Sequence, residues 1–336
     1  MKKTIILLSA LAVLTACTKE IKFKGDQVDP KIVLNGLIEP GNPVSVNISK
    51  SVFFLDNTGD TQAPDDLVAS LYVNGNRIGE MTPHFDTIYY YDGWSVYDAV
   101  PEQIIKVYTH DYCPSVGDEV KITASANGFD DVEGTTSALP NEVAWNLDDI
   151  QITLWEESFE EYDLDTIWTI SANMNLYLEI TDPDPGKTDY FRIHLKSGNY
   201  SDEENLNAFY ISTTYDDPVF GNTATNSDII DMDLISRPEG VFTDVLFDGR
   251  SYKIKLPLYV HITYWDKSAI ASIPVPISME HLSREYYYYL NTSNQVDEFM
   301  QFFTEPVQTY TNVNGGFGIV GGRTVDSLQF VLPWNN

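Results

Sequence analysis

The chain has 336 residues, of which 43% are hydrophobic and 13% aromatic, so it can bury a sizeable core and is too apolar for an intrinsically disordered protein. Fifty acidic and 20 basic residues give a formal net charge of −30, which excludes nucleic acid as a partner and opposes binding to an anionic lipid surface through a basic face. The two cysteines, Cys17 and Cys113, cannot supply the disulfide framework that holds small secreted domains together.

The first 16 residues have the layout of an export signal. Lysines at positions 2 and 3 precede an uncharged apolar run over residues 4–14. A membrane-spanning helix needs about 20 such residues, so the run targets the chain and does not span a bilayer. The next segment, LTAC at residues 14–17, resembles the bacterial lipobox, which predicts cleavage between Ala16 and Cys17 and attachment of lipid to the Cys17 thiol. The alternative is a secretory signal with a chance cysteine, but no A-x-A cleavage site competes nearby.

A lipidated Cys17 is an anchor. Each buried methylene contributes about 0.8 kcal/mol, so several acyl chains on one N-terminus hold far more firmly than a single myristoyl chain. Residues 17–29 are polar and mixed in charge, which suits a tether. Thr18-Lys19-Glu20 loosely resembles the surface-export signal of Bacteroidetes lipoproteins, so we expect an outer-membrane protein that faces the cell surface. Cys113 then lacks an intramolecular partner, and we expect it to be a small buried apolar residue.

Residues 30–140 are predicted to form an immunoglobulin-like antiparallel β-sandwich. Short apolar runs bounded by turn residues indicate strands and show no helical period. Asn74-Gly75 predicts a hairpin, because both central positions of a type I′ turn need a positive φ. The expected strands cover residues 31–38, 44–54, 66–73, 104–108 and 120–126, and Ser137 to Asn141 ends the domain.

Residues 141–336 are predicted to form a second β-rich domain with one short covering helix. Apolar residues at helical spacing after Pro274 and Pro276 place that helix at residues 279–291. The acidic stretch 155–165 is expected to be a solvated loop. Strands are expected at residues 143–154, 167–180, 190–195, 241–246, 252–256 and 258–265, followed by a glycine-rich pair at 309–320 and 326–332.

Several segments spread over nearly the whole mature chain carry one resemblance: residues 32–41, 215–220, 246–249, 286–289 and 303–319. The most specific of them is the long block 303–319. Together they resemble the Bacteroidetes outer-membrane lipoprotein family catalogued as domain of unknown function 4249. The family is similar in genomic setting to accessory lipoproteins paired with TonB-dependent transporters, which implies a role in nutrient capture, and no catalytic residues carry over from it.

The chemistry that the sequence supports is sparse. The motifs H-E-x-x-H, G-x-S-x-G, C-x-x-C and the Walker loop are absent, and we expect neither an enzyme nor a cofactor. His194 and His261 alternate with apolar neighbours and are interpreted as strand residues. The carboxylates of 156–165 could serve glycoside hydrolysis, but no spacing fixes a pair of them across a cleft, so a solvated face is favoured. The five histidines are His84, His110, His194, His261 and His281.

Calcium is a second possibility, because Asp182, Asp184 and Asp189 supply the hard oxygen ligands that Ca²⁺ prefers. Their spacing does not fit an EF-hand loop, so a turn is favoured over a metal site. Asp56 to Asp60 offers similar oxygen ligands, and its spacing does not fit an EF-hand loop either.

An aromatic segment, residues 89–97, is the candidate for ligand or partner binding. Aromatic rings stack on sugars, peptides and proteins alike, so the ligand class stays open, and packing within the sandwich is an equal alternative. The candidate residues are Tyr89, Tyr91, Trp94 and Tyr97.

These observations together predict a non-enzymatic accessory or ligand-binding partner of a TonB-dependent outer-membrane barrel in nutrient uptake. The alternative is a structural or adhesive cell-surface lipoprotein without a transport role. In the first case the barrel contact is expected at residues 89–97 or 303–319, where aromatics and glycines coincide. The ligand, the identity of the transporter and the oligomeric state do not follow from the sequence.

Overall fold

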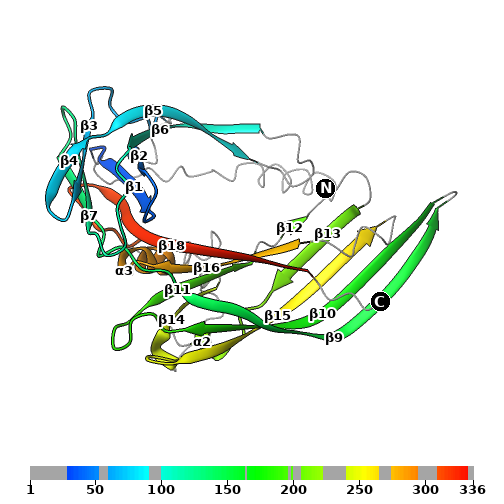
Figure 1. Cartoon of the computed structure of the whole chain (residues 1–336). Helices are drawn as coiled ribbons and strands as arrows, with labels where there is room; N and C mark the ends of the chain where they lie inside the picture. The colour runs from blue at the N-terminus through cyan, green and yellow to red at the C-terminus, as the bar shows by residue number, and fades with distance from the viewer. Residues whose placement is uncertain are drawn as a thin grey trace, which may run out of the picture.

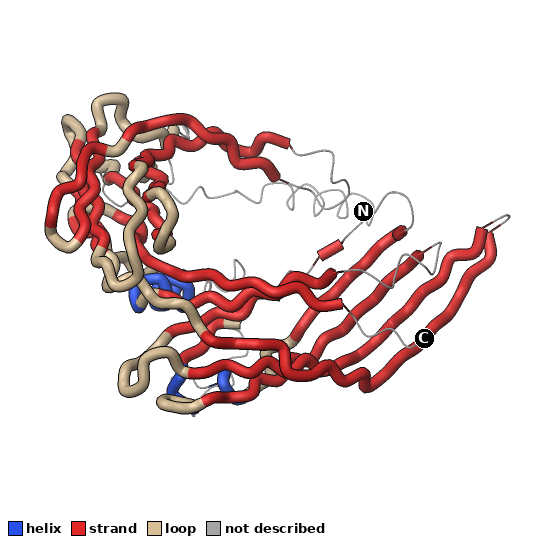
Figure 2. The backbone as a smooth tube through the Cα atoms, in the orientation of Figure 1, coloured by secondary structure: helices blue, strands red, loops and turns tan. Residues whose placement is uncertain are grey.

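The computed structural model describes residues 29–52, 60–90, 100–162, 165–195, 198–199, 206–221, 240–264, 274–293 and 309–331. These residues form a mainly β molecule with a sandwich-like arrangement of three sheets, as predicted from the sequence (Figure 2). No helix among them is long and apolar enough to cross a membrane.

The N-terminal part of the chain contributes eight strands. Strand β1 alternates buried and half-buried residues along its length, which is the period-2 pattern of a sheet with one face in the core. The strands are β1 (Ile32–Ile38), β2 (Val44–Lys50), β3 (Val68–Val73), β4 (Asn76–Glu80), β5 (Thr82–Tyr90), β6 (Val100–His110), β7 (Val120–Ser125) and β8 (Val132–Thr135).

The described residues from position 144 onward contribute ten strands, two short helices and one 3-10 helix. The strands are β9 (Ala144–Tyr162), β10 (Asp165–Thr181), β11 (Tyr190–Leu195), β12 (Gly198–Asn199), β13 (Leu206–Thr213), β14 (Val241–Thr243), β15 (Ser251–Tyr264), β16 (Pro274–Leu282), β17 (Val313–Asn314) and β18 (Phe317–Val331). The helices are α2 (Pro218–Gly221), η1 (Asp244–Leu246) and α3 (Arg284–Ser293).

One eight-stranded sheet runs through both halves of the molecule, in the order β14-β11-β16-β18-β1-β2-β6-β5. A five-stranded sheet, β17-β8-β7-β3-β4, packs with its N-terminal half, and another, β12-β13-β15-β10-β9, packs with its C-terminal half. Two hydrophobic cores result, and β18 contributes Val320 to the first core and Phe330 to the second (Figure 1). The two sandwiches are therefore joined by shared strands as well as by the connection near residue 140.

The first core is discontinuous in sequence. Most of its residues come from positions 32–139, but Val313 and Val320 return to it from the C-terminal end of the chain. Strand β18 pairs in parallel with β1, with Gly318 opposite Leu34. Gly318 has a φ of 109°, and a Cβ there would overlap the carbonyl oxygen of Leu34, so the pairing requires glycine. A contiguous domain of residues 30–140 is therefore incomplete without this returning strand.

The expected hairpin at Asn74-Gly75 is confirmed. Asn74 and Gly75 have φ values of 51° and 77°, and the turn joins β3 to β4. Three other expectations are wrong. Residues 155–162 of the acidic stretch continue β9, because β10 pairs along their whole length. The separate strands expected at 252–256 and 258–265 form the single strand β15 up to Tyr264, and most of the C-terminal glycine-rich pair forms β18.

The covering helix exists but begins later than predicted. Met279 to Leu282 belong to β16, where Met279 is buried and pairs with β11 and β18 on either side. The helix starts at Arg284, after Ser283, whose hydroxyl accepts hydrogen bonds from the backbone amides of Tyr286 and Gly322. Ser278, directly before the predicted helix, lies inside β16. Helix α3 packs against β18 where the two sandwiches meet (Figure 1).

Candidate functional site

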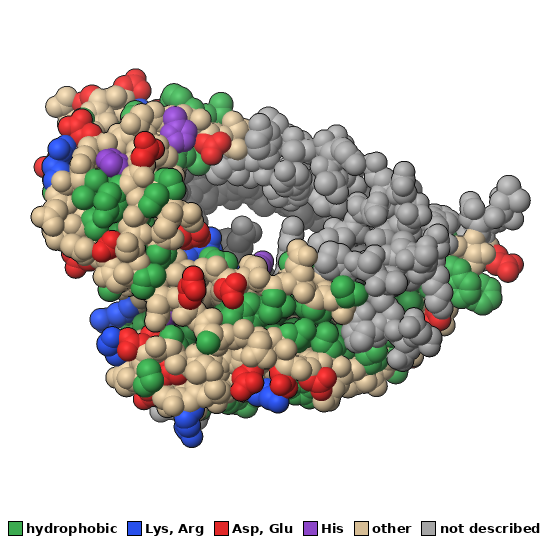
Figure 3. Space-filling view, viewed as in Figure 1, with side chains coloured by type: hydrophobic (Ala, Val, Ile, Leu, Met, Phe, Trp, Pro, Cys, Tyr) green, Lys and Arg blue, Asp and Glu red, His purple; other side chains and the backbone are tan. Residues whose placement is uncertain are grey.

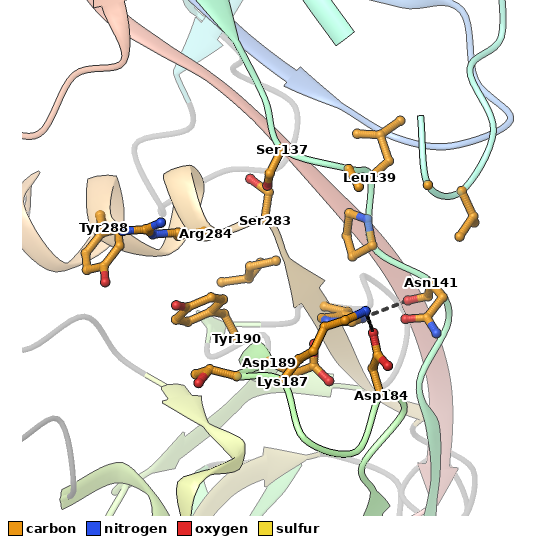
Figure 4. Close-up of a pocket in the computed structure, with 17 residues that line it drawn as sticks. Ser137, Leu139, Asn141, Asp184, Lys187, Asp189, Tyr190, Ser283, Arg284 and Tyr288 are labelled. Atoms are coloured by element: carbon orange, nitrogen blue, oxygen red, sulfur yellow. Dashed lines mark hydrogen bonds and ion pairs between the residues drawn. The ribbon is translucent and has the colours of Figure 1, made fainter. Parts of the chain in front are cut away.

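A cleft of about 610 Å³ lies where the two sandwiches meet. Four segments line it: Val116-Gly117 before β7, the connection from Ser137 to Asn141, residues 184–190 between β10 and β11, and the end of β16 with the start of α3 (Figure 4). Its volume is in the range of small-molecule sites in proteins. The space-filling view shows acidic side chains scattered over the described surface (Figure 3). The cleft is therefore a candidate binding site.

A buried histidine forms one wall of the cleft. The Nδ1 atom of His281 lies 2.9 Å from the carbonyl oxygen of Asn141, and its Nε2 atom lies 3.2 Å from a carboxylate oxygen of Asp189. Both partners accept hydrogen bonds, so making both bonds requires a proton on each ring nitrogen, or a proton on Asp189. The ring also stacks on Phe191 at 5.1 Å between centroids. His281 thus ties the connecting segment to the second sandwich.

Charged and phenolic groups line the rest of the cleft. Lys187 pairs with Asp184, and the Arg284 guanidinium lies 5.5 Å from the ring centroid of Tyr288. Burial raises the pKa of Tyr190 to about 12, with a smaller contribution from Tyr288. At neutral pH the cleft therefore presents neutral hydroxyls beside both signs of charge, which suits recognition of a polar ligand.

Glu285 fixes α3 to the opposite side of the cleft. Its carboxylate accepts hydrogen bonds from both the backbone amide and the hydroxyl of Ser137, at 3.1 and 2.8 Å. These bonds join residues that lie 148 positions apart in the chain. The cleft is held by specific polar contacts from both halves of the molecule.

The three calcium candidates are not gathered in one site. Asp184 pairs with Lys187 and Asp189 with His281, while Asp182 turns toward Asp244 and Asp248. Ligand oxygens of these last three residues lie within 4.8 Å of one another. Burial raises the pKa of Asp244 to about 6, and the nearby carboxylates of Asp189 and Asp182 also raise it.

Sequence reasoning missed Asp244, Asp248 and His281 as members of these sites. Asp244 and Asp248 flank a predicted turn more than 60 positions after Asp182, and single-sequence spacing cannot bring such distant segments together. His281 was assigned to a helix and so was not placed inside a sheet. The one available signal was that Phe247-Asp248-Gly249-Arg250 and Asp182 to Gly186 both look like acidic turns at strand ends.

Most of the other predicted residues lie outside the part of the chain that the structure describes. Residues 1–28, with Ala16 and Cys17, lie outside the described residues, as do Asp56 to Gly59 and the aromatics Tyr91, Trp94 and Tyr97. Tyr89 lies in β5 opposite Pro101 of β6.

The remaining cysteine and two histidines can be placed. Cys113 is exposed, which overturns its expected burial: it lies in the segment after β6, and its thiol donates to the Asp111 carbonyl at 3.6 Å. His194 and His261 are strand residues as predicted, in β11 and β15. The Nδ1 atom of His261 lies 3.1 Å from the Ser171 hydroxyl on the neighbouring strand.

The family described as "Domain of unknown function (DUF4249)" matches residues 18–329. The chain belongs to this family. No curated protein matches the chain. A solved structure titled "The Enterococcus faecalis MSCRAMM ACE binds its ligands by the collagen Hug Model" aligns over 89% of this chain and 98% of its own, at 11% identity. Its TM-score of 0.10 indicates no common fold, so nothing is carried over from it.

Proposed function

We propose that this DUF4249 protein is a lipid-anchored outer-membrane protein that faces the cell surface and acts without catalysis, as a ligand-binding accessory of a TonB-dependent transporter. The observation that carries the proposal is the combination of a lipobox ending at Cys17 with a mainly β body that has a polar cleft at its centre. The lipid supplies the attachment, and the body supplies the binding surface.

The net charge of the chain is consistent with attachment through the lipid and binding through the body. A formal net charge of −30 opposes close adsorption to anionic headgroups, so the body stands off from the bilayer on the tether of residues 17–29. The cleft, by contrast, contains both Lys187 and Arg284 in its lining. These two basic groups lie beside Asp184 and Asp189, so the cleft offers both signs of charge to a polar ligand.

The anchor is tested by fractionating cells that express Cys17→Ser. We expect the variant to leave the outer-membrane fraction and to stop incorporating labelled fatty acid, because the apolar run of residues 4–14 is too short to hold the chain in a bilayer. Cys113→Ser is the matched control, because it removes the other cysteine from an exposed position, and it should keep the label and the location. Label retained by Cys17→Ser would reject the lipobox.

The partner is tested by purifying the wild-type protein from outer membranes in mild detergent. Co-purification of a TonB-dependent barrel, lost on replacing Arg284 and Lys187 together but kept on replacing exposed Arg77, would support a cleft that serves transport. Co-purification that survives the double replacement would move the contact elsewhere, with residues 89–97 and 303–319 tested next. Purification without any barrel protein would reject the transporter role and favour the structural or adhesive one.

A further inference from the structure

Two connections cross between the sheets at one end of the second sandwich. The first leads from β10 in the five-stranded sheet to β11 in the eight-stranded sheet, and the second leads from β14 back to β15. They are hydrogen bonded to each other: the Gly186 amide donates to Asp248 at 2.7 Å, and the Gly249 amide donates to Asp182 at 2.5 Å. Figure 1 shows both connections at the same end of the molecule. A ligand bound between these two connections would therefore join the two sheets.

Three carboxylates meet at this crossing. Oxygens of Asp182, Asp244 and Asp248 lie within 4.8 Å of one another. Asp182 and Asp244 are only 6% and 1% exposed, whereas Asp248 is exposed, so the group opens to solvent on one side. None of the ion pairs formed among the described residues involves any of the three. Neighbouring carboxylates without a cation repel one another, and burial strengthens that repulsion.

The Asp244 side chain provides a second and independent observation. Its Oδ2 atom is buried and has no hydrogen-bond partner among the described residues. A buried carboxylate oxygen normally accepts at least one hydrogen bond, because leaving it without a partner costs the desolvation of a charged group. The backbone around it is ordered by other bonds: the Asp244 amide donates to the Asp189 carbonyl, and the Phe247 amide donates to the Asp244 carbonyl. The carboxylate that carries this orphaned oxygen lies beside two further carboxylates.

We propose that Asp182, Asp244 and Asp248 form a binding site for a hard divalent cation, Ca²⁺, which ties together the two connections at this end of the second sandwich. The site contains only oxygen ligands, which favours Ca²⁺, Mg²⁺ or Mn²⁺ over Zn²⁺ and Cu²⁺. Asp182 and Asp248 already accept backbone hydrogen bonds and so bind through their remaining lone pairs, while the Asp244 Oδ2 atom is unused.

Calcium fits better than magnesium. Magnesium demands near-ideal octahedral geometry at 2.0–2.1 Å, whereas calcium accepts six to eight oxygens at 2.3–2.6 Å in flexible arrangements. Carboxylates on two irregular connections, with one side open for water, suit the less demanding ion. The proposed ligands differ from the trio expected from sequence spacing, because Asp184 and Asp189 are engaged by Lys187 and His281.

The test uses the full-length protein in detergent, stripped with EGTA and titrated with CaCl₂ in a calorimeter. We expect binding in the range of extracellular modules, with a dissociation constant of about 10⁻⁴ M, and a higher melting temperature in calcium than in EGTA. An equal concentration of MgCl₂ should give a smaller rise. Absence of binding heat at about 1 mM CaCl₂, together with equal melting temperatures in calcium and EGTA, would overturn the proposal.

Variants separate a metal site from an acidic turn. Asp244→Asn removes a buried negative charge, so in EGTA it should melt at or above the wild-type temperature, but it should lose the rise in calcium. Asp248→Asn changes an exposed side chain and should raise the dissociation constant about tenfold or more. Asp184→Asn is the matched control on the same connection as Asp182 and should leave the dissociation constant for calcium unchanged. Wild-type affinity in Asp248→Asn would reject the site, even if Asp244→Asn failed to fold.

Discussion

The two cores of this protein are built from different side chains. The first is largely aliphatic, and among the described residues Tyr108 is its one buried aromatic. The second contains an aromatic cluster in which Phe191 lies 5.3 Å from Phe242, and Phe242 lies 5.4 Å from Phe220, between ring centroids. The first core instead depends on a distant strand, β18, which reaches it through a glycine. The second sandwich is thus stabilised by large side chains, and the first by the close approach of two backbones.

This contrast indicates which substitutions would destabilise each sandwich most. Aromatic side chains bury 150–250 Å² each, so the second core has a large hydrophobic contribution spread over several residues. The first core depends on the backbone geometry at β1 and β18, where a single added methyl group meets a carbonyl oxygen. Because the eight-stranded sheet is common to both cores, we expect damage at this point to reach the second sandwich as well.

The largest effect is expected from Gly318→Ala. The new Cβ would overlap the Leu34 carbonyl oxygen, and alanine is strained at a φ of 109°, so the free energy of unfolding should fall by about 3 kcal/mol or more. Gly221→Ala is the control: its Cβ would meet nothing within 4 Å, and the change should stay within about 0.5 kcal/mol. Calorimetry would measure both. Two separate transitions, with only one lowered by Gly318→Ala, would show that the cores unfold independently.

A smaller loss is expected at the ion pairs that join the sandwiches. Arg323 on β18 contacts Glu39, after β1, at 2.8 Å and Glu280 on β16 at 3.0 Å, and Glu280 is only 6% exposed. Arg323→Met would leave Glu280 as a buried charge without its cation, so stability should fall by about 2 kcal/mol. Arg77→Met, which breaks the exposed pair with Glu80, should cost less than about 0.5 kcal/mol in the same denaturant titration. Equal losses would mean that burial at Glu280 has no effect.

The smallest effects should have opposite signs in the two cores. Tyr108 and Tyr264 are both fully buried. The Tyr108 hydroxyl has no hydrogen-bond partner in the described part of the chain, whereas the Tyr264 hydroxyl donates to Glu157 at 2.9 Å. At pH 7, Tyr108→Phe should raise stability by about 1 kcal/mol, and Tyr264→Phe should lower it by about 1.5 kcal/mol. Denaturant unfolding of both variants checks the signs. A loss of stability in Tyr108→Phe would reveal a partner for that hydroxyl.

Tyr108 also gives a prediction at alkaline pH. Burial raises the pKa of Tyr108 to about 12, and the Asp65 carboxylate adds to the rise. A raised folded-state pKa means that the stability from the neutral hydroxyl is complete below pH 10 and is lost as the pH rises through about 12. Wild type should therefore lose about 1 kcal/mol more than Tyr108→Phe between pH 9 and pH 11. Parallel stability curves for the two proteins would contradict this.

Local sequence patterns predicted the parts of the fold that depend on neighbouring residues. Alternation of apolar residues gave β1, β3, β7 and β11 almost to their ends, and Asn74-Gly75 gave a type I′ turn because glycine and asparagine tolerate a positive φ. The same reasoning failed where partners override the local pattern. The glutamates of residues 156–161 look like a loop, but they extend β9 because each residue of this stretch pairs with β10. Strand β9 lies at the edge of its sheet, and the side chains of this stretch remain exposed to solvent.

The candidate sites were the least predictable part. Sequence spacing identified Asp182, Asp184 and Asp189 as a group because they are close in the chain, but the structure divides them among Lys187, His281 and a separate carboxylate cluster. Asp244 and Asp248 join Asp182 only because two connections cross at one end of a sandwich. A single sequence carries no information about which distant segments will meet in this way.

The sequence by itself determined the acidic character of the chain, the β class and the family, because each depends on composition or on residues that are near neighbours. The export signal and the lipobox at Cys17 are predictions from the same kind of local pattern. The tertiary structure alone decided the parallel pairing of β1 with β18, the eight-stranded sheet common to both cores, the cleft beside His281 and the crossing that gathers Asp182, Asp244 and Asp248. The physical reason is that long-range strand pairing is selected by the joint burial of apolar faces from the whole chain. A short stretch of sequence does not contain all the residues that share this burial.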